Sequence, residues 1–252
     1  MSGFPTSFHL GPLVFHTYGL GLALAAYVAY FYSEKRLVKA GLSVTPFGRY
    51  TAWLLASGLI GARLANIATN WSYYVGHFGR WLSVWQGGLA SFGGIALAIP
   101  FGLYFKRRYW PDEPLLSFLD ALIPALVAGW AVGRFLGPQF MVDGGGHLTH
   151  QWFGMHYVGQ IGRRVPVPLI QGLEDAALWL VLLGVENWRR LAKPGLITGL
   201  GLLCWGVVRA LDERLLLGQQ SHSGSVGVQL AGLVLSVIGL IVLVSRGRKI
   251  AR

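Results

Sequence analysis

Long apolar stretches, separated by short polar segments, form the main pattern along this chain. An α-helix needs about 20 predominantly apolar residues to cross the hydrocarbon core of a bilayer. Seven stretches approach or exceed that length, at residues 12–32, 49–69, 87–105, 115–136, 168–186, 195–216 and 226–245. The pattern predicts an all-α integral membrane protein with seven transmembrane helices, which form a single membrane domain over residues 1–252.

Basic residues between the predicted spans gather on alternate sides of the membrane. Only Arg80, Arg163 and Arg164 lie in loops on one side. The other side carries 14 of the 21 Lys and Arg residues, namely Lys35, Arg36, Lys39, Arg49, Lys106, Arg107, Arg108, Arg189, Arg190, Lys193, Arg246, Arg248, Lys249 and Arg252. Because cytoplasmic loops carry the excess of positive charge, the N-terminus is expected outside and the C-terminus in the cytoplasm.

Two longer connections fall on the outer side, at about residues 70–86 and 137–167. Both are rich in Trp, Tyr and Gly, which suits folding at the level of the lipid headgroups. The composition agrees with this topology, since hydrophobic residues make up 54% of the chain, charged ones 12%, and the mean hydropathy is +0.52. A net charge of +11 would suggest nucleic acid in a soluble protein. Here the topology explains it, and no nucleic-acid partner is expected.

Three arginines, Arg63, Arg134 and Arg209, lie inside predicted spans. A guanidinium stays charged at any accessible pH, and holding one at bilayer depth costs about 2.5–3.5 kcal/mol. Three such residues together cost roughly 8–10 kcal/mol, which is comparable to the whole stability of a small domain. We therefore expect these arginines to face an interior cavity and to meet an anion there, either a lipid phosphate or a buried carboxylate.

Short motifs surround these arginines in a distinctive order. They are His16-Thr17-Tyr18-Gly19-Leu20, Gly61-Ala62-Arg63, the segment WQGGL at 85–89, Ser91-Phe92-Gly93-Gly94, Asp120 with Gly133-Arg134, and Trp205-Gly206-Val207-Val208-Arg209 followed by Glu213. In order and spacing, this set resembles bacterial prolipoprotein diacylglyceryl transferase over nearly the whole chain. Members of that family move the diacylglyceryl group of phosphatidylglycerol to the lipobox cysteine of a prolipoprotein, in the bacterial inner membrane.

The resemblance implies roles for individual residues. Arg134 and Arg209 match the positions that the family uses for phosphate binding and catalysis, where a guanidinium can hold phosphate oxygens bidentately. Glu213, four residues after Arg209, is expected to orient or neutralise that arginine. The set of expected substrate-binding residues is Tyr18, His16, Arg63 and Asp143. The partners implied are an anionic phospholipid, phosphatidylglycerol, and a lipoprotein precursor or another acceptor at the outer face.

Structural roles stay open for the same residues. Arg134 and Arg209 can form buried ion pairs with Asp120, Asp143, Asp212 or Glu213, and Asn66 and Asn70 can line Arg63. Tyr18 and His16 lie near the membrane interface, where aromatic residues are common. The histidines His147, His150 and His156 invite a metal site, but no carboxylate or cysteine completes a metal motif. Neither a metal nor another cofactor is therefore expected.

The chain departs from the family pattern at polar positions. Phe92 stands where the family carries a histidine within S-F-H-G-G. Both asparagines after Arg134 are lost, and Asp143 is the candidate to replace a glutamate there. Of H-P-S-Q-x-Y-E before the fifth span only Pro166 remains. Two readings follow: a divergent transferase that uses another base, such as His16 or a histidine of the outer loop, or a paralogue with another acceptor. A non-catalytic phospholipid-binding protein is a third possibility, which turnover would distinguish.

Because phenylalanine cannot transfer a proton, Phe92→Ala is expected to lower transferase activity far less than Arg134→Ala or Arg209→Ala. The measurement is the mass gained by a lipobox peptide in the presence of phosphatidylglycerol. Equal inactivation by Phe92→Ala in well-folded protein would show that position 92 has a role beyond filling space.

Overall fold

The computed structural model describes residues 5–10, 13–82, 91–137, 143–188, 194–212 and 222–248, with side chains left out for 9–16, 91–92, 222–228 and 247–248. The chain divides into two compact units. The first contains Met1–Ala40 and Leu116–Arg252, and the second contains Gly41–Leu115. The two units are described separately below.

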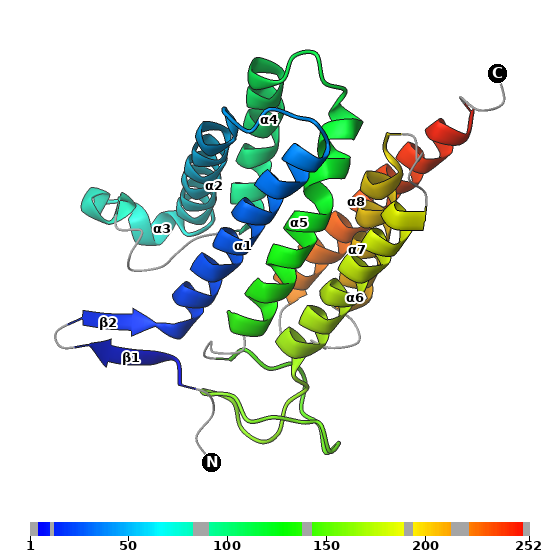
Figure 1. Cartoon of the computed structure of the whole chain (residues 1–252). Helices are drawn as coiled ribbons and strands as arrows, with labels where there is room; N and C mark the ends of the chain where they lie inside the picture. Colours follow the sequence, from blue (N-terminus) through cyan, green and yellow to red (C-terminus); the bar gives the residue numbers. More distant parts are fainter. Residues whose placement is uncertain are drawn as a thin grey trace. The chain divides into compact units, whose positions relative to one another are not determined.

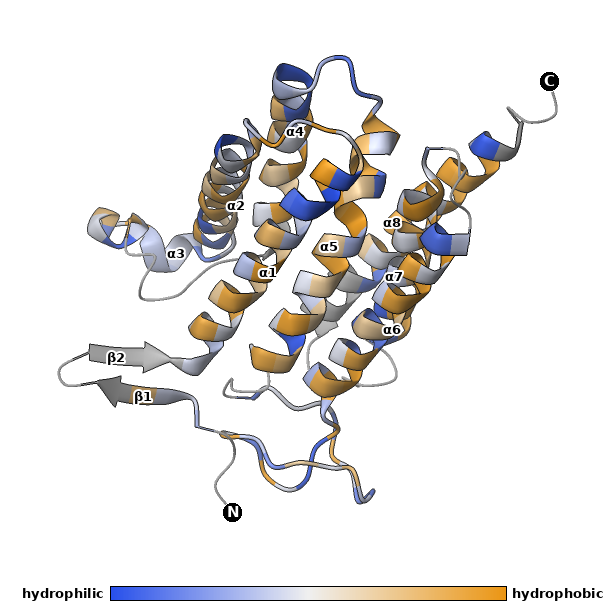
Figure 2. Cartoon of the chain, viewed as in Figure 1, coloured by the Kyte–Doolittle hydropathy of each residue, from blue (hydrophilic) through white to orange (hydrophobic). Residues whose placement is uncertain are grey.

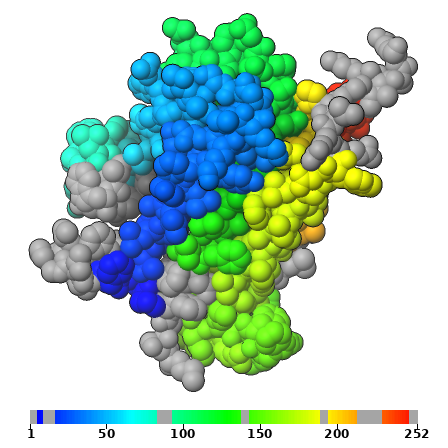
Figure 3. Space-filling view, in the orientation of Figure 1, coloured from blue at the N-terminus to red at the C-terminus, as the bar shows by residue number. Residues whose placement is uncertain are grey.

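The first unit consists of a short hairpin and five long helices (Figure 1). Strands β1 (Ser7–Leu10) and β2 (Leu13–His16) pair antiparallel, with Ser7 opposite His16. The helices are α1 (Thr17–Lys39), α5 (Leu115–Leu136), α6 (Val167–Trp188), α7 (Leu196–Asp212) and α8 (His222–Arg248). Between α5 and α6, residues 143–166 form a loop that lies near the start of α6 (Figures 1 and 3).

Helices α7 and α8 approach each other closely because small residues lie at their contact. A Cβ added to Gly206 would lie 2.5 Å from Ser236 Oγ and 2.8 Å from Ser236 N, and would collide with the carbonyl oxygen of Gly232. Ser236 in turn donates its hydroxyl to Gly232 O at 2.9 Å. Packing of this kind, with backbones close together, is typical of helices that associate in lipid.

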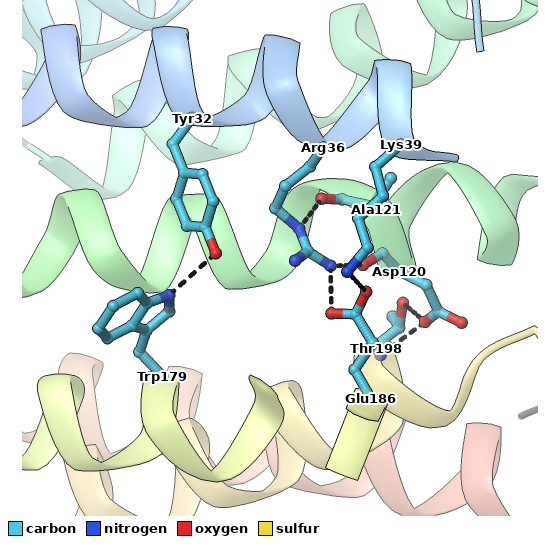
Figure 4. Close-up of polar contacts among 8 residues, drawn as sticks. All are labelled: Tyr32, Arg36, Lys39, Asp120, Ala121, Trp179, Glu186 and Thr198. Carbon is cyan, nitrogen blue, oxygen red and sulfur yellow. Dashed lines mark hydrogen bonds and ion pairs between the residues drawn. The ribbon is translucent and has the colours of Figure 1, made fainter. Parts of the chain in front are cut away.

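Polar contacts connect helices α1, α5, α6 and α7 of the first unit (Figure 4). Arg36 of α1 is 7% exposed, donates to Ala121 O of α5 at 2.7 Å and pairs with Glu186 of α6 at 2.9 Å. The Asp120 carboxylate of α5 accepts hydrogen bonds from Gly195 N at 2.6 Å and Thr198 N at 2.7 Å. Because the first N–H groups of a helix lack intrahelical partners, Asp120 caps the start of α7, and this role replaces the ion pair with Arg134 or Arg209 considered from the sequence.

The second unit contains α2 (Phe47–Thr69), α3 (Trp71–Tyr74), a 3-10 helix η1 (Phe78–Trp81) and α4 (Ser91–Tyr109). Helices α2 and α4 pack through glycines, since a Cβ on Gly93 would collide with Gly61 O and the Ala65 side chain.

Each of the seven predicted spans overlaps one of the long helices of the described residues. The first helix begins at Thr17 rather than at residue 12, because residues 13–16 form β2. Four helical segments among the described residues are long and apolar enough to cross a membrane, namely Phe47–Thr69, Leu115–Leu136, Val167–Trp188 and Gln229–Arg246.

Hydrophobic residues are frequent along these helices (Figure 2), and many of their side chains are exposed. Leu180 of α6 is 60% exposed, and Leu233 and Ile241 of α8 are 52% and 60% exposed. Large exposed apolar surfaces are rare on soluble monomers. The structure is therefore that of a largely helical membrane protein, while the number of seven spans and the orientation of the termini stay predictions.

Gly206→Ala is expected to destabilise the first unit by about 1–3 kcal/mol, because the added methyl group overpacks the contact between α7 and α8. The matched control is Gly184→Ala on α6, where an added Cβ meets nothing within 4 Å. Thermal unfolding of the purified protein in detergent would measure both variants. Equal unfolding midpoints for the two would contradict the close contact.

Candidate functional site

A group of polar side chains meets inside the first unit, on α6 and α7. We call it the arginine–carboxylate cluster and define it as Gln171, Glu174, Asp175, Arg209 and Asp212. On α6 the first three are spaced i, i+3 and i+4, and on α7 the other two are spaced i and i+3, so each set shares one helix face. Helical spacing alone therefore directs five polar side chains toward one place between two apolar helices.

Arg209 lies at the centre of the cluster and is only 3% exposed. Its Nη2 is 2.8 Å from Asp175 Oδ1, and its Nη1 is 2.9 Å from Asp212 Oδ2. The same Nη2 donates to Gln171 O at 3.3 Å, and Gln171 Nε2 donates to Asp212 Oδ2 at 3.0 Å. Asp175 and Asp212 are 1% and 4% exposed. The guanidinium is thus held between two buried carboxylates.

A buried group of ion pairs such as this one is stable only when its charges and polar atoms are well matched. Removing two charges from water costs several kcal/mol per ion, and their attraction offsets this only when geometry is good and remaining polar atoms are satisfied. Among the described residues, Gln171 Oε1, Glu174 Oε2, Asp175 Oδ2 and Arg209 Nε are buried and have no hydrogen-bond partner. Three acceptors and one donor are therefore available in the cluster, and most buried polar atoms in proteins do have partners.

Arg134 approaches the cluster from the last turn of α5. It is partly exposed, and it interacts electrostatically with Arg209, Asp175, Asp212 and Tyr18. No ion pair joins Arg134 to a described residue, unlike Arg209. Arg134 is therefore the guanidinium that is available to an incoming anion.

A matching pair of tryptophans explains why the two arginines lie near each other. Arg134 follows Trp130 by four residues and lies 5.7 Å from the centre of its ring, and Arg209 follows Trp205 in the same way at 5.6 Å. The two indole rings meet edge to face with centroids 5.6 Å apart. Since each ring carries its own guanidinium by a cation–π contact, the contact between α5 and α7 brings both positive charges to one region.

Tyr18, the third residue expected here, lies in the first turn of α1 and is partly buried. Its ring is at the end of α5, where a Cβ added to Gly137 would meet Tyr18 Cδ2 at 3.4 Å. Tyr18 also interacts electrostatically with Arg134. The structure therefore brings Tyr18, Arg134 and Arg209 into one region. Asp212, which the sequence offered as an ion-pair partner of these arginines, lies there too and pairs with Arg209.

The other expected site residues belong to the second unit, to the loop before α6, or to the part of the chain that the structure does not describe. Arg63 belongs to the second unit, where Nε donates to Trp81 O at 2.9 Å, a second nitrogen donates to Arg80 O, and the guanidinium lies 5.2 Å from the Tyr74 ring centre. Asn66, expected to line Arg63, accepts from Tyr74 Oη at 2.9 Å. Asp143 is exposed with φ of 58°. Glu213 and the His16 side chain lie outside the described residues.

The loop histidines show no metal-binding arrangement in the described part of the chain, where no group of three His, Cys, Asp or Glu side chains could hold a metal ion. His147 Nδ1 lies 3.0 Å from Leu148 O, and His150 is exposed. The loop itself is held by Arg163, which donates to Gly154 O at 2.9 Å and Trp152 O at 2.6 Å.

Sequence reasoning missed Gln171, Glu174 and Asp175. The sequence feature that could have revealed these three residues is the one that identified the arginines. Ionisable residues inside an apolar span have a high free-energy cost and require partners. Two adjacent carboxylates within α6, at the spacing that faces α7, therefore predict the anions that Arg209 meets.

Arg134 forms no ion pair with a described residue, and it lies beside a buried charge cluster among apolar helices. This arrangement defines a membrane protein with an internal site for an anionic group. Comparison with known proteins gives the family. The sequence matches the family described as prolipoprotein diacylglyceryl transferase over residues 5–245, and the chain belongs to that family.

Named relatives agree with this assignment. A phosphatidylglycerol–prolipoprotein diacylglyceryl transferase of Thermus thermophilus is 34% identical over 140 residues, which cover 56% of this chain and 50% of the relative's own length. Similar proteins of that name from Streptococcus pyogenes and Streptococcus uberis are 26% and 22% identical, and each alignment covers 97% of this chain and 96% of the relative.

Asp175→Asn is expected to destabilise the first unit by about 3–5 kcal/mol, because it removes one partner of a buried ion pair and leaves Arg209 poorly compensated. The control is Lys39→Ala, which removes a pair with Glu186 whose lysine side chain is 63% exposed; such surface pairs contribute about 0–1 kcal/mol. Unfolding of both variants in detergent would measure the difference. Similar small losses would mean that Asp175 does not balance Arg209.

Proposed function

We propose that this protein transfers the diacylglyceryl group of phosphatidylglycerol to the lipobox cysteine of a prolipoprotein. The cysteine sulfur attacks the glyceryl carbon that carries the phosphate, the carbon–oxygen bond breaks, and glycerol 1-phosphate leaves. Family membership over residues 5–245 and the names of the relatives support this reaction. The single structural observation that carries it is the placement of Arg134, which has no ion-pair partner among the described residues, beside the buried cluster of Arg209.

The chemistry needs a group that holds the phosphodiester and stabilises charge on the departing phosphate. Arg134 suits the first requirement, because its guanidinium has no described ion-pair partner and a planar fork binds phosphate oxygens in pairs. Arg209 suits the second, since it is fixed in position before the reaction by Asp175 and Asp212. Donors that are oriented in advance, away from water, stabilise developing charge most effectively.

The unpartnered atoms of the cluster also suit this substrate. Gln171 Oε1, Glu174 Oε2 and Asp175 Oδ2 need hydrogen-bond donors, and Arg209 Nε needs an acceptor. A glycerol phosphate headgroup offers both kinds of group, as hydroxyls and as phosphate oxygens. Tyr18, at the end of α5 beside Arg134, adds a phenolic hydroxyl that can bond to the same lipid.

Other predictions complete the proposal. The protein crosses the bacterial inner membrane seven times, with its N-terminus outside, so that the acceptor peptide approaches from the outer face and the lipid enters laterally. The chain acts as one membrane domain. Arg63, Asp143, His16 and Glu213 keep the supporting roles that the family resemblance implies. The paralogue with another acceptor and the non-catalytic lipid binder are disfavoured by the names of the relatives.

Arg134→Ala is expected to lower transfer by about 100-fold or more, since loss of one preorganised donor to a transition-state anion has an effect of that size. Its unfolding midpoint is expected to stay near that of the unmodified protein, because Arg134 forms no ion pair with a described residue. The assay uses purified protein, phosphatidylglycerol and a lipobox peptide, with the peptide mass as the readout.

The matched control is Lys39→Ala, which also removes one positive charge; among the described residues, the Lys39 side chain pairs with Glu186 alone. It is expected to retain most of the activity. Arg209→Ala is expected to abolish transfer as well, and to destabilise the protein because Asp175 and Asp212 lose their shared cation. Full activity of folded Arg134→Ala would refute the phosphate-binding role.

A further inference from the structure

Helices α5 and α7 lie side by side and run in the same direction. A Cβ added to Gly201 of α7 would lie 2.6 Å from Ile123 Cγ2 of α5. Further along both helices, Trp130 of α5 meets Trp205 of α7 edge to face, with ring centroids 5.6 Å apart. Residue numbers therefore increase together along the two helices, and equivalent turns of α5 and α7 lie next to each other.

The same short motif, a tryptophan followed by an arginine four residues later, occurs on both helices. Four residues span about 6 Å of an α-helix, slightly more than one turn. Arg134 lies over the Trp130 ring, 5.7 Å from its centre. Arg209 lies over the Trp205 ring in the same way, at 5.6 Å. Because the helices are parallel, the two tryptophans share one turn of the pair and the two arginines share the next.

Different groups hold the two guanidinium groups. Arg209 pairs with Asp175 at 2.8 Å and with Asp212 at 2.9 Å. For the Arg134 side chain, the described residues supply no ion pair and no hydrogen bond, and the contact that they do supply is the Trp130 ring. An aromatic ring therefore lies against Arg134, whereas carboxylates lie against Arg209.

An aromatic ring and a carboxylate hold a guanidinium by different means. A carboxylate accepts hydrogen bonds from the N–H groups and offsets the positive charge. The face of an indole ring attracts the cation through its quadrupole, and it carries no charge of its own. Since phosphate oxygens bind the same N–H groups in pairs, a carboxylate partner would compete with phosphate for Arg134, whereas a ring leaves the charge and the N–H donors to the phosphate.

We propose that Trp130 is the residue that positions Arg134 for the phosphate of an anionic phospholipid, and that Trp205 fixes the Trp130 ring. The proposal rests on the proposed function and deepens it, because it names what sets the affinity of the phosphate site. Trp130 is 44% exposed, whereas Trp205 is partly buried. Aromatic rings prefer the edge-to-face arrangement that these two indoles adopt, so the more buried ring holds the more exposed one. Trp130 acts through Arg134 and is a positioning residue.

Two molecules of the proposed reaction carry a phosphate that can reach Arg134. They are phosphatidylglycerol, as a lipid headgroup, and glycerol 1-phosphate, as the free product. A ring that acts through Arg134 raises the affinity for both by the same factor, because both present phosphate oxygens to the guanidinium. A ring that touches the lipid chains would raise the affinity for the lipid alone. Comparison of the two ligands therefore separates positioning from direct lipid contact.

Trp130→Leu tests the proposal, since leucine keeps an apolar side chain and removes the ring. Binding of dihexanoyl phosphatidylglycerol and of glycerol 1-phosphate to the purified protein is measured by titration calorimetry, without acceptor peptide. Both dissociation constants are expected to rise by about 3- to 30-fold, the range that corresponds to one cation–π contact. Trp130→Phe is expected to keep most of the affinity, because phenylalanine retains a ring face for Arg134.

A double-mutant cycle shows whether Trp130 acts through Arg134. In Arg134→Ala protein, Trp130→Leu is expected to weaken binding by no more than about 2-fold further, since residues that work as one unit have non-additive effects. The matched control is Trp53→Leu on α2, which removes a tryptophan that is 48% exposed and stacks on Phe105 at 5.4 Å. Its dissociation constants are expected to equal those of the unmodified protein. The unfolding midpoint of each variant is measured in detergent alongside binding.

Three results would overturn the proposal. Unchanged affinities in folded Trp130→Leu would show that the ring does not position Arg134. Equal losses with and without the Arg134 side chain would show that Trp130 acts independently of it. Weaker binding of the lipid alone would assign the ring to the lipid chains.

Failure of the proposed function is distinguishable from these results. An unmodified protein that binds neither phosphate compound would refute the phosphate site itself. An unmodified protein that binds both compounds without modifying a lipobox peptide would refute the transfer reaction, while the role of Trp130 in phosphate binding would still be decided by the double-mutant cycle.

Discussion

The site depends on the burial of the Arg209 guanidinium between the carboxylates of Asp175 and Asp212. An arginine at membrane depth cannot lose its charge, so α6 must supply an anion wherever α7 carries this cation. That requirement fixes the rotation of the two helices about their axes, because Gln171 and Asp175 must face Arg209 while leucines face outward. Loss of any partner would leave an uncompensated charge in an apolar interior.

For this reason we propose different tasks for the two arginines. Arg209 is already neutralised and held in position, which suits a group that stabilises charge as it develops. Arg134, from α5, has no ion-pair partner in the part of the chain that the structure describes, and it suits the first capture of an anionic lipid. The Trp130–Trp205 contact connects both, since each ring supports one guanidinium. In this proposal, the surroundings of the two arginines assign lipid binding to Arg134 and catalysis to Arg209.

The pattern of hydrophobic residues was sufficient to locate the long helices, because an apolar stretch of this length satisfies its own backbone hydrogen bonds in lipid as a helix. It placed the start of α1 too early, since the apolar residues of β2 continue the pattern of the helix. Arg134 and Arg209 were predictable from the cost of their charge. Glu174 and Asp175 follow from the same cost, but family motifs drew attention to Glu213. The cap at Asp120 depends on tertiary contact with α7, which local sequence does not encode.

Stoichiometry of the reaction tests the central claim most directly. Purified protein, phosphatidylglycerol and a lipobox peptide would be followed for peptide mass and for released glycerol 1-phosphate in the same sample. The account predicts one glycerol 1-phosphate for each peptide that gains a diacylglyceryl group. Lipid that is bound without release of glycerol 1-phosphate, or released headgroup without modified peptide, would contradict the account.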